Sequence, residues 1–119
     1  MKYLAYITLL TKEYAPLIIG NLVGLGWVVG PANSKNLCSA DDSKIGALMA
    51  VTVDPMSVMT STDIVKAIQQ VLTELKVSYF SIVLSTYNQG AWVYGNIARD
   101  RPTSWERLES ETNAVIDTP

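Results

Sequence analysis

The 119-residue sequence contains no histidine, which removes the commonest general base and the commonest metal ligand from the side chains available for chemistry. It contains one cysteine, Cys38, so an internal disulfide is excluded and nothing points to an oxidising compartment. We therefore expect a cytoplasmic protein. Because no histidine can activate the thiol, Cys38 is interpreted as a small residue of a polar loop.

Charged residues are also scarce. They make up 17% of the chain, against about 25% in a typical domain, whereas 49% of the residues are hydrophobic. An apolar excess at this length is typical of chains that bury an interface, so a homodimer or higher oligomer is expected. The net charge of −2 provides no basic face for a phosphate backbone, and we expect no nucleic-acid partner.

Residues 14–34 carry no charge and approach the ~20 residues that span a bilayer. Glycines, prolines and the central Asn21 interrupt this run, which favours a buried helix followed by a short strand over a membrane segment or a secretory signal. Gly20 and Gly24 lie within that helix rather than between a strand and a helix, where a phosphate-binding loop belongs. They are interpreted as positions of close packing between the helix and a sheet.

The region from Thr60 to Thr86 has the most regular pattern in the chain. Apolar residues recur at helical spacing after a capping-box-like start at Thr60 and Asp63, and they predict a helix over 62–76. Alternation of apolar and polar residues then predicts a strand over 78–86. The predicted core face of the helix is Ile64, Ile68, Val71, Leu72 and Leu75.

The order of elements predicts the fold class. The sequence indicates strand 3–10, helix 13–24, strand 26–30, polar loop 31–44, strand 45–54, helix 62–76 and strand 78–86. This β-α-β-β-α-β order predicts an α+β fold of the ferredoxin-like, split βαβ type, with a four-stranded antiparallel sheet and two helices on one face. Residues 1–97 would form this single domain.

The other face of such a sheet would be open. Its predicted lining is mixed in polarity, and the simplest way to cover it is with a second copy of the chain or with the C-terminal tail. The positions concerned are Tyr6, Thr8, Thr52, Ser81, Val83 and Ser85.

The C-terminal part begins with a turn signal at 87–90 and a short predicted strand at Ala91–Tyr94. Residues 98–119 then form a tail that holds 8 of the 20 charged residues and one predicted helical turn near Trp105. All three arginines lie in this tail.

One group of residues is a candidate binding site. Aromatic rings and guanidinium groups can sandwich a planar ring and hold a phosphate or carboxylate, or can form a protein hot spot. Covering a sheet edge and pairing with surface glutamates is the simpler interpretation of the same residues. The group comprises Trp92, Tyr94, Asn96, Arg99 and Arg101.

The sequence favours a non-catalytic regulatory or inhibitory binding module that recognises a protein or a small nucleotide-like or anionic ligand. A cofactor-independent enzyme of the dimeric α+β barrel type is the first alternative, using Tyr6, Asn88 and Trp92, and a structural subunit is the second. Asp41, Asp42 and Asp54 have no metal-ligand spacing, so neither a metal nor a cofactor is expected.

Overall fold

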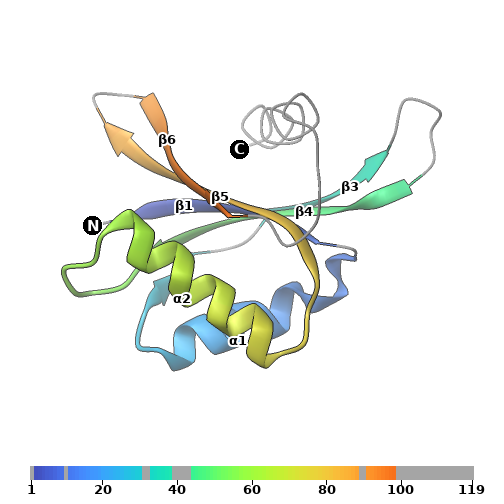
Figure 1. Ribbon diagram of the computed structural model, residues 1–119, viewed down its shortest axis with the longest axis horizontal. Coiled ribbons are helices and arrows are strands. Elements are labelled where there is room, and N and C mark those ends of the chain that lie inside the picture. The colour runs from blue at the N-terminus through green and yellow to red at the C-terminus, as the bar shows by residue number, and fades with distance from the viewer. Residues whose placement is uncertain (1, 10, 31–32, 39–43, 89–90, 99–119) are drawn as a thin grey trace.

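The fold is an antiparallel β-sheet with two helices on one of its faces (Figure 1). The computed structural model describes residues 2–9, 11–30, 33–38, 44–88 and 91–98. The α+β class predicted from the sequence is confirmed. The elements are β1 (Tyr3–Leu9), η1 (Lys12–Tyr14), α1 (Ala15–Gly24), β2 (Val28–Val29), β3 (Asn33–Cys38), β4 (Lys44–Asp54), α2 (Ser61–Glu74), β5 (Tyr79–Asn88) and β6 (Ala91–Ala98).

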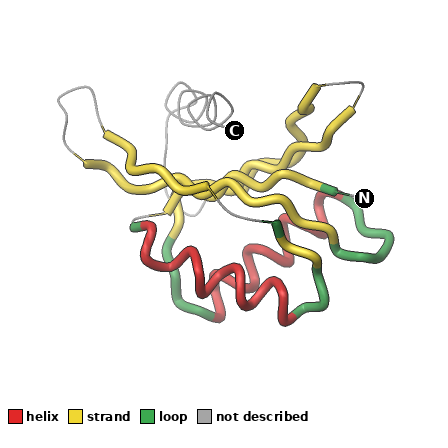
Figure 2. The backbone as a smooth tube through the Cα atoms, turned by 180° about the vertical axis from the view of Figure 1, so that it is seen from behind, coloured by secondary structure: helices red, strands yellow, loops and turns green. Residues whose placement is uncertain are grey.

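The strands are hydrogen-bonded in the order β2-β4-β1-β5-β6, and β3 also pairs with β4. β1 pairs with one edge of β4, while β2 and β3 share the other edge. β2 lies beside Val53 and Asp54, and β3 lies beside residues 44–50. β1 therefore lies in the centre, between β4 and β5. Seen from behind, both helices remain on the same side of the strands (Figure 2).

The polar segment 31–44 is not a continuous loop, and that prediction is wrong. Asn33–Cys38 forms β3, an edge strand whose last residue, Cys38, is paired with Lys44. Asn, Ser and Lys have low strand propensity, so the local sequence gives no strand signal. The eleven-residue β4 extends well beyond β2 and offers a free edge, and pairing along this edge overrides the local preference.

Helix α2 has well-defined capping at both ends. The Thr60 hydroxyl accepts a hydrogen bond from the Asp63 N–H (3.2 Å), and the Asp63 carboxylate accepts one from the Thr60 N–H (3.2 Å), which completes a capping box. At the other end Lys76 adopts φ 56°, and the N–H groups of Lys76 and Val77 donate to the carbonyls of Thr73 and Leu72. This is a Schellman motif, and it turns the chain directly into β5.

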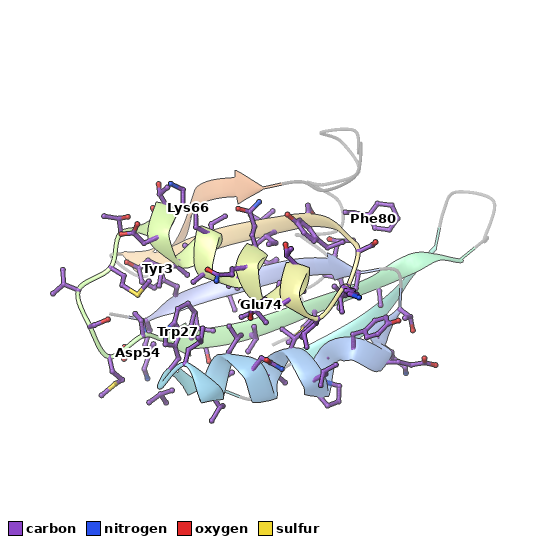
Figure 3. All side chains as sticks on the ribbon, turned by 60° about the horizontal axis from the view of Figure 1, so that its bottom comes forward. Tyr3, Trp27, Asp54, Lys66, Glu74 and Phe80 are labelled. Atoms are coloured by element: carbon purple, nitrogen blue, oxygen red, sulfur yellow. The ribbon has the colours of Figure 1, made fainter. Side chains whose placement is uncertain are left out.

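The main core lies between the helices and the sheet. Alternate residues of the central strands, with Ile18 and Leu22 of α1, fill it. Trp27 and Tyr3 lie near the end of the sheet where β4 finishes at Asp54, and the Tyr3 hydroxyl donates to the Met59 carbonyl at 2.9 Å (Figure 3). The predicted core face of α2 is confirmed, with Leu75 half-buried. Its fully or largely buried residues are Ile64, Val65, Ile68, Val71 and Leu72.

The second face of the sheet carries a smaller apolar cluster, and it is not open within a single chain. Tyr6 and Leu48 are each 1% exposed, and Val83 is 3% exposed. The neighbouring hydroxyl residues of β1 and β5 are also buried, and Thr52 is half-buried. The expected self-association through this face depended on exposed area at these positions. Because they are buried or half-buried, that exposed area is missing. The buried hydroxyl residues are Thr8, Ser81 and Ser85.

Candidate functional site

The predicted binding group lies partly within the described residues and partly outside them. Trp92, Tyr94 and Asn96 belong to β6, the strand at one edge of the sheet, where Trp92 pairs with Tyr87 and Tyr94 pairs with Ser85. Their side chains are outside the description. Arg99 and Arg101, with the rest of segment 99–119, lie beyond the described residues altogether. The register places positions 92 and 94 on one side of the strand, and the proposed grouping stays a prediction.

The residues of the enzyme alternative lie at separate places along the sheet. Tyr6 pairs with Val83 in the middle of β5, whereas Trp92 pairs with Tyr87 and Asn88 with Ala91 at its end. At about 3.3 Å per residue, the four steps from Val83 to Tyr87 correspond to roughly 13 Å along β5. The backbone therefore does not bring Tyr6 and Trp92 to one point.

Three hydroxyl groups of the second face form hydrogen bonds within the sheet. The Ser81 hydroxyl donates to the Thr8 hydroxyl at 3.1 Å, and the Ser85 hydroxyl donates to the Leu4 carbonyl at 3.4 Å. All three side chains are at most 1% exposed. Buried hydroxyls that bond across strands stabilise the pairing of β1 with β5, because each satisfies a polar group that water cannot reach.

Two described carboxylates have lowered pKa values, and both have structural partners. The backbone N–H of Met56 donates to Asp54 at 2.9 Å and lowers its pKa, while the hydroxyl and N–H of Thr60 lower the pKa of Asp63. Asp54 closes the turn after β4, and Asp63 caps α2. Among the described residues, no group of three or more acidic or cysteine side chains is placed to hold a metal ion, and Asp41 and Asp42 are not among those residues.

The Asp63 cap predicts an acid-dependent contribution to stability. Because its pKa is lower in the folded protein, this contribution is complete above the unfolded value of about 3.9 and is lost as the pH falls through the folded pKa. Asp63→Asn should therefore destabilise the protein at pH 7 and cost progressively less below about pH 4. Urea unfolding of both proteins at a series of pH values measures this. An equal difference at every pH would contradict a role for the ionised carboxylate.

An apolar surface on α1 and the segments beside it is the clearest candidate for recognition. The last turn of α1 lies near β2, and Val28 of β2 pairs with Asp54, two residues before Met56. The large apolar side chains involved are about half exposed or more. We call this the α1 surface; it comprises Tyr14 (41% exposed), Leu17 (49%), Val23 (53%), Leu25 (52%), Val28 (57%) and Met56 (68%).

The glycines of α1 belong to this surface rather than to the core. A methyl group added at Gly20 or Gly24 would meet no atom within 4 Å, so neither position contacts the sheet. Ala15, Ile18 and Leu22 are the residues that α1 buries. The prediction that the glycines allow close packing on the sheet is therefore wrong. Gly20 lies two residues from both Ile18 and Leu22, about 200° around the helix, so the burial of that pair turns Gly20 away from the sheet.

Helix α1 has no polar side that could interact with water at this surface. Its ten residues, APLIIGNLVG, include no charge, and the only amide side chain, Asn21, donates to the Leu17 carbonyl at 2.9 Å. A surface helix normally places polar residues opposite its buried stripe. An apolar outer side is typical of a helix that contacts another protein.

No helix in the described part of the chain combines the length and the apolar character needed to cross a membrane. α1 is ten residues long, and within the uncharged run 14–34 it is followed by the two-residue strand β2. The preference for a helix followed by a short strand is confirmed. Comparison with known proteins adds no assignment, since no family model, no curated protein and no solved structure matches the chain significantly.

Proposed function

We propose that the chain is a non-catalytic regulatory or inhibitory binding module of ferredoxin-like architecture, and that it recognises a protein through the α1 surface. The observation that carries this proposal is the exposure of six large apolar side chains on α1 and the segments beside it. Monomeric proteins rarely expose a contiguous apolar area of more than a few hundred Å² without a partner for it.

The strand order supports the architectural part of the proposal. β1-α1-β2 and β4-α2-β5 are two successive β-α-β units, and their strands are arranged as β2-β4-β1-β5. A split pair of such units, with both helices on one face, is what the ferredoxin-like assignment requires. β3 divides the edge beside β4, and β6 adds a strand beyond β5.

The polar groups support binding rather than catalysis. The hydroxyls of Thr8, Ser81 and Ser85 on the second face bond to each other or to backbone, and Asp54 and Asp63 serve a turn and a cap. A general acid or base has to reach a substrate proton, and these groups are occupied by structural bonds. A protein partner is preferred to a small anionic ligand because the exposed side chains of the α1 surface are apolar and α1 carries no charge.

Site-specific photo-crosslinking in the host cells tests the proposal. The photoreactive residue p-benzoylphenylalanine would replace Leu17, which is 49% exposed on α1, and in a matched control it would replace exposed Gln70 on α2. We expect a defined protein adduct from position 17 and none from position 70, identified by mass spectrometry. No adduct from position 17, or the same adducts from both positions, would overturn the proposal.

A further inference from the structure

We infer that the α1 surface binds a second copy of this chain, so that two α1 helices cross at Gly20 about a two-fold axis. This inference rests on the proposed function, because it names the partner of the same surface. Three features of α1 carry it: open glycines at helical spacing, the absence of charge, and the extent of the exposed apolar area.

The glycines suit a contact between identical helices. In a two-fold dimer each residue at the axis meets its own copy, so a side chain there would hold the helices apart. Gly20 and Gly24 are four residues apart, on one side of α1, with open space above both. Small residues at this spacing let two helices approach more closely than the usual 8–10 Å, and Leu17 and Val23 can then pack beside the crossing point.

The electrostatics also favour an identical partner. Symmetry places a charge that lies at the two-fold axis against the same charge of the other copy, and like charges at close range are unfavourable. No residue from Ala15 to Gly24 is charged, so this cost does not arise along the helix. The Asn21 amide already donates to the Leu17 carbonyl, which reduces the cost of removing it from water.

The exposed area is close to what a stable dimer needs. Six large apolar side chains, each at least 41% exposed, present on the order of several hundred Å². A standard interface buries about 800 Å² per partner. The apolar part of the α1 surface can therefore supply most of one side of such an interface, with its surrounding polar residues forming the rim.

Size-exclusion chromatography with light scattering, together with native mass spectrometry, tests the inference. Wild-type protein at micromolar concentration should have twice the chain mass of 13.0 kDa. Gly20→Lys should raise the dimer dissociation constant by at least about 100-fold, because two lysines would meet at the axis in an apolar interface. Gln70→Lys, on the exposed side of α2, should leave the dimer unchanged. Since Gly20 faces open space, the Gly20→Lys chain should keep its circular dichroism spectrum.

Disulfide trapping locates the axis independently. In a Cys38→Ser background, Gly20→Cys should form an intermolecular disulfide on mild oxidation, because that bond requires Cα atoms about 4.4–6.8 Å apart. Gln70→Cys should not.

A monomeric wild-type protein, or a dimer that survives Gly20→Lys and gives no trapped disulfide, would overturn the inference. If the wild type is monomeric but photo-crosslinking at position 17 captures a different protein, only this inference fails. If photo-crosslinking at position 17 captures nothing, the proposed function fails as well.

Discussion

Replacing Ile68 with aspartate should abolish cooperative folding. Ile68 is fully buried between α2 and the sheet, and the described core around it is apolar. Burying an unpaired carboxylate and removing the apolar side chain should together cost about 4 kcal/mol or more, a large fraction of the 5–15 kcal/mol typical of a domain. Urea unfolding followed by circular dichroism and by tryptophan fluorescence measures this change.

The matched control for Ile68→Asp lies on the same helix. Gln70 is exposed, and its amide donates to the Glu74 carboxylate at 3.2 Å. Gln70→Asp places the same new charge on α2 and should cost only a few tenths of a kcal/mol, the size of an unfavourable pair at this spacing. A folded and cooperative Ile68→Asp protein would contradict the assignment of the α2 core face, and equal losses in both variants would do so too.

Replacing Gly46 with alanine should be nearly as damaging. Gly46 lies in β4 with φ 145°, a conformation that residues with a Cβ rarely adopt, and an added Cβ would overlap the carbonyl oxygen of Leu9 in β1. The strain and the displacement of a central strand should together cost about 3 kcal/mol or more. The midpoint of chemical unfolding and the yield of folded protein both measure the effect.

Gly24→Ala is the matched control for Gly46→Ala. The added methyl meets nothing within 4 Å in the same chain, and alanine is favoured over glycine in a helix. The stability of the monomer, measured below the dimer dissociation constant, should therefore be equal or slightly higher. If Gly46→Ala were as stable as this control, β4 could not have the backbone described at residue 46. A loss confined to Gly46→Ala would locate an essential close approach between β1 and β4.

Where local and tertiary preferences agree, the sequence predicts the fold closely. α2 has a capping box, an apolar stripe and a polar side, and its predicted span of 62–76 differs from the observed Ser61–Glu74 by at most two residues. β5 was found from its alternation in the same way. β3 was missed because Asn33–Cys38 is polar, and only the free edge of β4 makes it a strand.

The candidate site was harder to predict than the fold. α1 is apolar on all sides, so its composition does not distinguish the buried stripe from the exposed one. The choice depends on whether Ile18 and Leu22 or Leu17 and Val23 face the sheet, and only tertiary packing decides this. The predicted group around Trp92 was chosen by residue type alone, and the register adds only that positions 92 and 94 share a side of β6.

The central position of β1 has a consequence for how the protein is synthesised. Both neighbours of β1 come much later in the chain. β4 begins at Lys44, and Ser81 of β5, which bonds to Thr8 of β1, lies 73 residues after Thr8. No hairpin can therefore build the middle of the sheet, and folding has to close long loops first, which makes it slower than the folding of a meander of similar size. During translation the apolar segment Tyr3–Leu9 leaves the ribosome well before either partner strand, so its apolar side chains stay without the partners that later bury them.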